Sequence, residues 1–382
     1  MFPQMSRTFR IGNREVGWGC PIFMTAEIGA AHCGRFEDLL RMIRAAAEAG
    51  CDGADIFMAD PSAFYYRAMS NGHDYIKDWH NLHFTDEQWA EAIKLGEELG
   101  IVVYPTPLDR ISVARCAKLG VKMCNINSDD VNNYLLLQDI AKLGIPVSMH
   151  DIDQTLSEVE AAVKTLRDNG AHDIIVLHST LESGNDRFAY ETANLEVINT
   201  YRQAFGGLGV LAGCVEHTKS DFLINTVAAF RPALISKHIQ IDPRTNPNDP
   251  KISINIDRLG QMVHELRMSE MALGAGMNQR VIKSDGSIPA RTRNKVLVSD
   301  RFIPKGKIVE AADVIGKRPG DYGGLHPSTA RFIIGSRAVE DIPENTKLSL
   351  SMFTDYQDPE YKFPESENHI EIIKDKKDNY NV

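Results

Sequence analysis

The sequence predicts a (β/α)8 TIM barrel followed by a small β-rich domain. Eight short apolar runs alternate with amphipathic helical stretches between residues 22 and 271, and this alternation is typical of parallel strands joined by crossover helices. Several helical stretches end at a glycine, such as Gly50, Gly100 and Gly120, where a left-handed residue can terminate a helix. Beyond residue 294 the pattern changes to short β-like runs separated by turns.

The eight predicted strands, in chain order, are Ile22–Ile28, Ala54–Met58, Ile101–Tyr104, Val121–Ile126, Pro146–Met149, Ile174–His178, Val210–Cys214 and Leu234–His238. The stretches between them have helical period, as in the apolar positions of Phe36–Ala47. Eight βα units predict a closed barrel, in which catalytic groups lie at the carboxyl ends of the strands.

The predicted domain boundaries follow changes in composition. Residues 1–280 form the barrel with an N-terminal cap hairpin, residues 281–294 a linker, residues 295–352 the small domain, and residues 353–382 a charged tail. The connection over residues 59–85 is long and rich in aromatic side chains. It is either a binding loop or a packed surface excursion.

Composition narrows the function classes. The 382 residues are 43% hydrophobic and 25% charged with a net charge of −10, so we expect no nucleic acid or membrane partner. The six cysteines form no CxxC pair, which favours a reducing cytoplasm. The sequence has neither the apolar region of a secretory signal nor an apolar run long enough for a membrane span.

Two histidines are the first candidates for chemistry. His217 and His238 each close an apolar run in consecutive β/α units, so both side chains can reach one mouth of the barrel. Imidazole nitrogen binds divalent first-row metals, and two such ligands leave positions open for water and substrate. A histidine taken alone is more often a hydrogen-bonded structural residue than a metal ligand.

Several motifs together resemble the sialic acid synthase family. The segment Ala26–Gly34 (AEIGAAHCG) resembles the AEIGxNHxG opening of that family. The other matches, in the family's order, are Pro105–Asp109, Ser128 ahead of Asn133, Leu177–Thr180, Glu216–Thr218 where the family has DHT, Lys237–His238, and Asn248–Ser253 for PDHxxS. Residues 295–350, with Ile303–Gly306 and Asp313–Gly320, resemble its C-terminal antifreeze-like (SAF) domain.

The resemblance implies a reaction and a metal. The family condenses phosphoenolpyruvate with an amino-sugar aldehyde, here expected to be N-acetylmannosamine-like, giving a nonulosonic (sialic-type) acid and phosphate. His217 and His238 would hold a divalent metal, Mn²⁺ or Mg²⁺, that polarises the aldehyde. Glu27 would orient or activate water as a general base.

The resemblance also implies the substrate-binding residues. Ser128 and Ser148 match serines that contact the phosphate or carboxylate of the donor, and Asp249 matches the position that binds sugar hydroxyls. Thr106 lies at another polar position of the family and is also expected to bind substrate. Arg318 corresponds to an arginine of the small domain that reaches into the partner subunit's barrel. A domain-swapped homodimer acting on small molecules in the cytoplasm is therefore expected.

Two departures leave alternatives open. Asp55 and Asn125 occupy the positions of the two donor-binding lysines of the family, and a carboxylate beside a phosphate costs energy in a low-dielectric barrel. In a synthase, other cations would have to compensate; the candidates are Arg35, Arg110, Lys122, Arg187 and Lys237. The alternatives are a metal-dependent aldolase, lyase, isomerase or transferase acting on a carbonyl sugar without phosphoenolpyruvate, and a non-enzymatic carbohydrate-binding paralogue.

Overall fold

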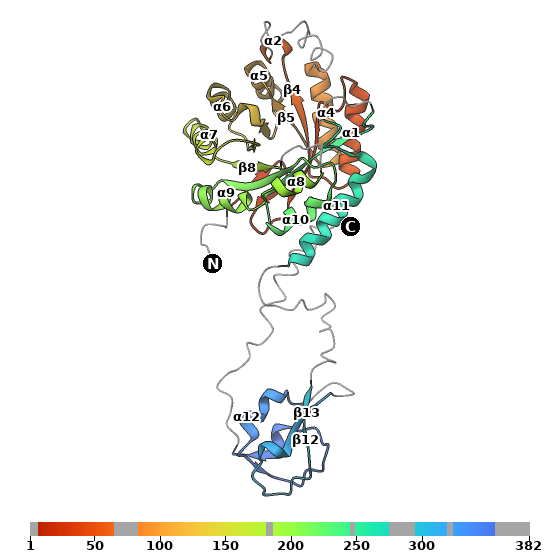
Figure 1. Ribbon diagram of the computed structural model, residues 1–382, viewed down its shortest axis with the longest axis vertical. Coiled ribbons are helices and arrows are strands. Elements are labelled where there is room, and N and C mark those ends of the chain that lie inside the picture. Colours follow the sequence, from red (N-terminus) through yellow and green to blue (C-terminus); the bar gives the residue numbers. More distant parts are fainter. Residues whose placement is uncertain are drawn as a thin grey trace. The chain divides into compact units, whose positions relative to one another are not determined.

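The computed structural model describes residues 7–64, 83–180, 186–244, 249–274, 295–318 and 324–355. The chain divides into two compact units, Met1–Met277 and Asn278–Val382. In the first unit, helices surround a ring of strands (Figure 1). The predicted linker at 281–294 and residues 65–82 of the long connection lie outside the described residues.

The first unit is the barrel that the sequence predicts. Its parallel strands are β3 (Phe23–Gly29), β4 (Gly53–Met58), β5 (Val102–Pro107), β6 (Cys124–Ile126), β7 (Val147–Asp151), β8 (Ile174–Ser179), β9 (Leu211–Glu216) and β10 (Leu234–Gln240). Hydrogen bonding joins them in the order β5-β4-β3-β10-β9-β8-β7-β6, with β11 (Ile254–Asn255) added beside β10. Because β5 and β6 lie next to each other at the ends of this path, the sheet is a nearly closed (β/α)8 barrel.

The helices form the outer layer. They are α1 (Phe36–Glu48), α2 (Pro61–Phe64), α4 (Asp86–Leu99), α5 (Arg110–Leu119), α6 (Tyr134–Ala141), α7 (Leu156–Asp168), α8 (Asp186–Thr192), α9 (Val197–Phe205), α10 (Phe222–Ala229) and α11 (Ile256–Leu273). Capping boxes begin α4 at Thr85 and α7 at Thr155, which satisfies backbone donors at both helix starts.

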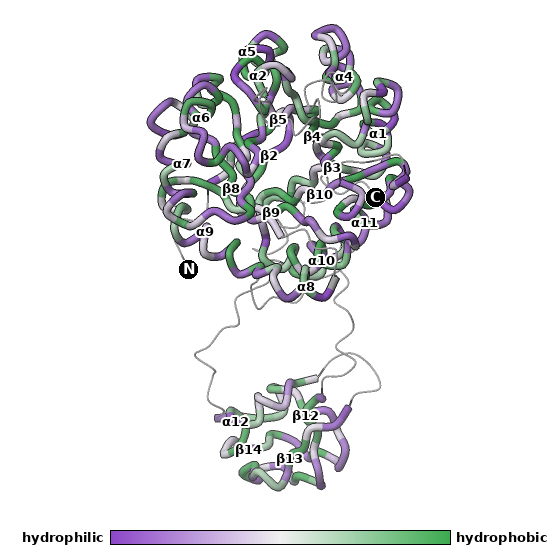
Figure 2. Tube along the Cα trace, turned by 45° about the horizontal axis from the view of Figure 1, so that its top comes forward, coloured by the Kyte–Doolittle hydropathy of each residue, from purple (hydrophilic) through white to green (hydrophobic). Residues whose placement is uncertain are grey.

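Alternation along the strands separates the two cores of the barrel. On β3, Met24 and Ile28 pack into the large core between strands and helices, whereas Phe23 belongs to the cluster inside the barrel. The hairpin of β1 (Thr8–Ile11) and β2 (Arg14–Gly17) adds Phe9, Ile11 and Val16 to that inner cluster. Apolar and polar stretches alternate along the barrel trace (Figure 2). The same period of two points Glu27 inward.

The second unit has a small β-rich core. β12 (Val296–Ser299) pairs antiparallel with β13 (Val314–Lys317), and β14 (Arg337–Ala338) pairs with β15 (Phe353–Thr354). Phe353 is buried in this core, so the folded unit extends past the predicted boundary at residue 352. The rest of the predicted tail, from residue 356, lies outside the described residues. No helix in the described segments is long and apolar enough to cross a bilayer.

Candidate active site

Three buried side chains meet at the carboxyl end of neighbouring strands. β10 lies between β3 and β9, and its His238 is in register with Glu27 of β3. His217 directly follows β9. One ligand atom from each of Glu27, His217 and His238 lies within 4.8 Å of the others, and the two imidazole centroids are 5.2 Å apart. The structure therefore brings both predicted histidines and Glu27 into one cluster.

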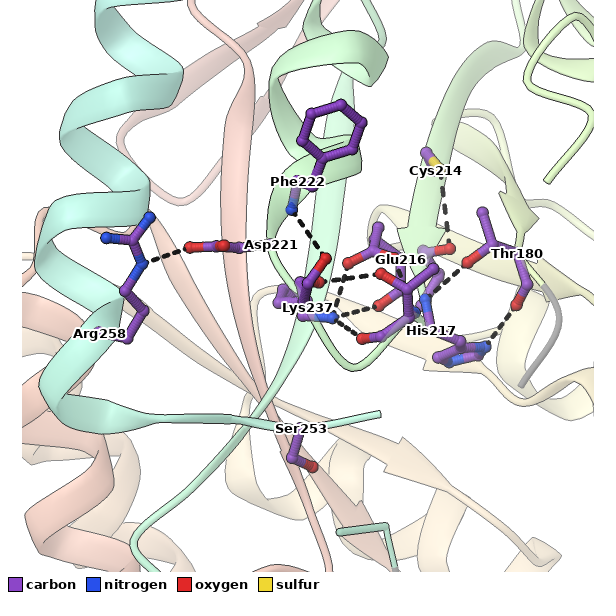
Figure 3. A network of polar contacts seen from close by, with 12 residues as sticks. Thr180, Cys214, Glu216, His217, Asp221, Phe222, Lys237, Ser253 and Arg258 are labelled. Carbon is purple, nitrogen blue, oxygen red and sulfur yellow. Dashed lines mark hydrogen bonds and ion pairs between the residues drawn. The ribbon is translucent and has the colours of Figure 1, made fainter. Parts of the chain in front are cut away.

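Thr180, just after β8, fixes His217 in a form suited to metal binding. Its hydroxyl accepts from the His217 backbone N–H at 2.7 Å, and its carbonyl lies 3.1 Å from His217 Nδ1 (Figure 3). Because a carbonyl only accepts, Nδ1 carries the hydrogen and Nε2 keeps its lone pair. Burial, together with the nearby His238, lowers the pKa of His217 to about 3, so the imidazole is neutral.

Glu27 and His238 form a charged pair inside the barrel. Glu27 Oε1 lies 3.1 Å from His238 Nε2, and Oε2 accepts from the Ser236 hydroxyl at 2.9 Å. Burial alone would raise the pKa of Glu27, but His238 outweighs it and holds that pKa below its usual value. Burial likewise opposes charge on His238, and Glu27 outweighs it to raise the pKa of His238.

The cluster fits a divalent cation. Two cis ligands about 2.1 Å from an octahedral ion lie about 3.0 Å apart, close to the 3.1 Å between Glu27 Oε1 and His238 Nε2. His217 offers a neutral nitrogen, and an ion would take over the role of the proton shared by His238 and Glu27. Mixed nitrogen and oxygen ligands suit manganese and related metals.

A second ion pair fixes the strands that carry the histidines. Lys237 on β10 and Glu216 on β9 are paired in register and immediately precede His238 and His217. Lys237 Nζ donates to Glu216 Oε2 at 2.6 Å and to the Thr218 carbonyl (Figure 3). Both side chains are fully buried. The pair therefore holds the two histidine positions in register.

A chain of hydrogen bonds crosses the opposite half of the barrel mouth. Ser148 Oγ donates to Asn125 Oδ1 at 2.7 Å, Asn125 Nδ2 donates to Thr106 Oγ1 at 2.9 Å, and Thr106 Oγ1 donates to Asp55 Oδ1 at 2.8 Å. All four side chains are buried. The hydroxyl hydrogens of Thr106 and Ser148 are thus already donated within the protein, although both residues were predicted to bind substrate.

Burial and neighbouring charge act together on Asp55. Burial raises the pKa of Asp55 well above its usual value, and the charge of Glu27 adds to the effect, while the Thr106 hydrogen bond opposes it. The hydrogen bond from Asn125 to Thr106 also joins β6 to β5, the two strands at the ends of the hydrogen-bonded path. The polar chain therefore helps to close the barrel as well as orienting Asp55.

The remaining predicted residues lie at varying distances from this centre. Ser128 begins the short helix Ser128–Asp130 after β6 and is buried. Asp249 is half-buried, and its charge contributes to the raised pKa of His238. Arg318 is exposed at the end of a described segment of the second unit. Its predicted contact with a partner barrel remains a prediction.

The partners that fix the histidines were not predicted as such. Thr180 and Glu216 were identified only as parts of motifs, and Lys237 as part of a motif and a candidate cation for the donor. The charged residue directly before each histidine was a usable signal of the pair. Of the candidate compensating cations, four form ion pairs with carboxylates: Arg35 with Asp38, Arg110 with Asp139, Arg187 with Glu191, and Lys237 with Glu216. The fifth, Lys122, is exposed.

Known proteins resemble the chain over most of its length. Residues 42–278 match the model of the NeuB family. A protein of Methanocaldococcus jannaschii is 29% identical over 88% of this chain and 96% of its own length. Human N-acetylneuraminate-9-phosphate synthase is 26% identical over 88% of this chain and 93% of its own. The crystal structure of the Bacillus subtilis spore coat polysaccharide biosynthesis protein SpsE, 25% identical, aligns over 91% of this chain and 99% of that chain with a TM-score of 0.61.

Proposed function

Because the chain belongs to the NeuB family, we propose that it condenses phosphoenolpyruvate with an N-acetylmannosamine-like amino-sugar aldehyde, forming a sialic-type acid and phosphate. Its characterised relatives include synthases of N-acetylneuraminate 9-phosphate, N,N'-diacetyllegionaminic acid and pseudaminic acid. The chain is accordingly an enzyme of the kind that forms carbon–carbon bonds. The observation that carries the proposal is the buried convergence of Glu27, His217 and His238.

Each member of this cluster has a task in the proposed reaction. A divalent ion, Mn²⁺ or Mg²⁺, held by His217 and His238 with Glu27, would supply the electrophile that polarises the aldehyde oxygen. Thr180 holds the Nδ1 hydrogen of His217 and so keeps Nε2 directed to the ligand position. Glu27, the carboxylate of the cluster, accepts the proton of the water that adds during phosphate release.

The proposal includes the substrate contacts and the assembly. Asp249, half-buried near His238, accepts hydrogen bonds from sugar hydroxyls, and Ser128 contributes to the donor site. The second unit acts as an SAF domain whose exposed Arg318 enters the barrel of a partner subunit in a domain-swapped homodimer. The small β-rich core and the exposure of Arg318 support this assignment.

Phosphate release tests the proposal. Purified protein with Mn²⁺, phosphoenolpyruvate and N-acylated amino sugars should release phosphate only when all three are present. His217→Gln should abolish release because it removes a metal ligand, whereas His178→Gln should retain it, since His178 bonds instead to the Ala193 carbonyl. No phosphate from the unsubstituted protein across a broad panel of N-acylated sugars would contradict the proposal.

The Asp55 hydrogen-bond chain favours a second candidate function. With the hydroxyl hydrogens of Thr106 and Ser148 committed internally, the protein would act as a metal-dependent aldolase, lyase, isomerase or transferase on a carbonyl sugar without phosphoenolpyruvate. Calorimetric titration separates the two functions. Tight binding of phosphoenolpyruvate that is lost in Ser128→Ala would eliminate this second candidate.

A further inference from the structure

A second group of potential ligands lies on the other side of Glu27. Asp55 of β4 is in direct register with Glu27 of β3, and His150 comes from β7 in the opposite half of the barrel. One ligand atom from each of these three side chains lies within 4.8 Å of the others. They are 1%, 1% and 3% exposed. Glu27 therefore belongs to two ligand groups at once.

The charges of this group call for a cation or a proton. Glu27 and Asp55 are two buried carboxylates on adjacent strands, and like charges repel strongly where water is excluded. Among the described residues, the buried cationic side chains other than His238, which pairs with Glu27, are Arg115 and Lys237. Arg115 pairs with Asp86 and Lys237 with Glu216. Neither is therefore available to neutralise Asp55, whose side-chain hydrogen bonds come from the neutral Thr106 hydroxyl.

His150 is the independent indication of a ligand. Its imidazole is buried beside the two carboxylates, yet neither ring nitrogen makes a hydrogen bond to any residue that the structure describes. A ring nitrogen without a protein partner is open to water or to an ion. A neutral imidazole has one nitrogen with a free lone pair. That nitrogen lies within 4.8 Å of the carboxylate oxygens, as a metal ligand requires.

We infer that Glu27, Asp55 and His150 bind a second divalent cation, so that Glu27 is shared in a dinuclear centre with the ion held by His217 and His238. The inference rests on the proposed metal site and extends it. Two oxygen ligands and one nitrogen can bind several divalent ions, manganese among them. Each Asp55 oxygen has two lone pairs, so the hydrogen bonds from Thr106 leave one free and orient the carboxylate.

The second ion changes what the centre attracts. With one divalent ion, the charges of Glu27 and Asp55 cancel that of the metal, and the centre is neutral. With two ions it carries two net positive charges at the mouth where an anionic phosphate or carboxylate group would enter. The second ion would thus supply the attraction for an anionic substrate that the committed hydroxyls of Thr106 and Ser148 cannot supply.

Counting bound manganese tests the inference. After dialysis of the full chain against MnCl₂, elemental analysis should find two ions per chain, and electron paramagnetic resonance should show an exchange-coupled pair. His150→Gln, which alters no carboxylate, should bind one ion and lose the coupled signal, and Asp55→Asn should do the same. His178→Gln, a buried histidine outside both groups, is the matched control and should bind two.

The outcomes separate the two sites. The second site would be overturned if the unsubstituted chain bound one ion, His150→Gln still bound it and His217→Gln lost it. The proposed function would then stand, and a proton on Asp55 would relieve the repulsion between the two carboxylates. No bound ion in the unsubstituted chain would overturn both. Circular dichroism of each variant verifies folding, and the count in the unsubstituted chain decides the question even if a variant fails to fold.

Discussion

The buried Lys237–Glu216 pair gives the sharpest stability prediction. Both side chains are 0% exposed, and Nζ lies 2.6 Å from Oε2. Lys237→Met removes the cation and leaves Glu216 charged or forced to take up a proton in a water-free position. Losing one member of a buried ion pair costs about 3–5 kcal/mol. We therefore expect the free energy of unfolding of the barrel to fall by that amount.

Urea denaturation followed by tryptophan fluorescence measures this change, because all three tryptophans, Trp18, Trp79 and Trp89, belong to the barrel part of the sequence. Lys164→Met is the matched control: its partner is Asp168 on an exposed helix face, so its loss should cost about 0.5 kcal/mol or less. Combining Lys237→Met with Glu216→Gln should restore part of the stability. A Lys237→Met loss no larger than that of the control would refute the reasoning.

Two further predictions concern the histidine support and the effect of pH. Thr180→Val removes the acceptor of the His217 backbone N–H and should weaken Mn²⁺ binding about 10-fold in a metal titration. Ser179→Ala is the control and should leave the affinity unchanged, because the buried Ser179 hydroxyl has no partner among the described residues. Equal Mn²⁺ affinities for both variants would contradict the role of Thr180. Burial raises the pKa of Asp130 to about 6 from a usual 3.8, so the folded state holds this proton more tightly than the unfolded state and stability falls as pH rises between these values. Asp130→Asn should therefore be more stable than the unsubstituted protein above pH 6, by about 1–2 kcal/mol after allowing for partial solvation. Denaturation curves should show that this difference disappears near pH 4. A stability difference that does not depend on pH would rule out the raised pKa of Asp130 as its cause.

The strands and the histidine pair were predictable because their signals are local. Apolar runs ending at polar residues located all eight strands to within three residues at each end, and strand ends of adjacent β/α units necessarily share one mouth. The lengths of the strands were harder to predict from the sequence. β7 continues to Asp151 and β9 to Glu216, so His150 and Glu216 are strand residues with fixed inward or paired positions, where the sequence only indicated residues near a loop.

Contacts across the barrel were beyond the reach of sequence patterns. The chain from Ser148 through Asn125 and Thr106 to Asp55 depends on four strands being in register, and no spacing along the sequence encodes that register. The resemblance identified Asp55 and Asn125 as departures from the family but could not show that each compensates the other through Thr106. Arg318 depends on a partner subunit, which the fold of one chain cannot supply.

The number of bound ions also changes how strongly the centre attracts an anionic donor. A neutral one-ion centre favours an uncharged carbonyl sugar, whereas a two-ion centre favours an anionic donor such as phosphoenolpyruvate. His150→Gln is the informative variant because it removes a ligand of the second ion without changing the charge of Glu27 or Asp55. If the donor is phosphoenolpyruvate, its affinity should rise with Mn²⁺ in the unsubstituted protein and remain weak in His150→Gln at every Mn²⁺ concentration. Equal affinity in both proteins would show that the second ion has no part in donor binding, and the attraction for the phosphate would then have to come from residues outside the Glu27, Asp55 and His150 group.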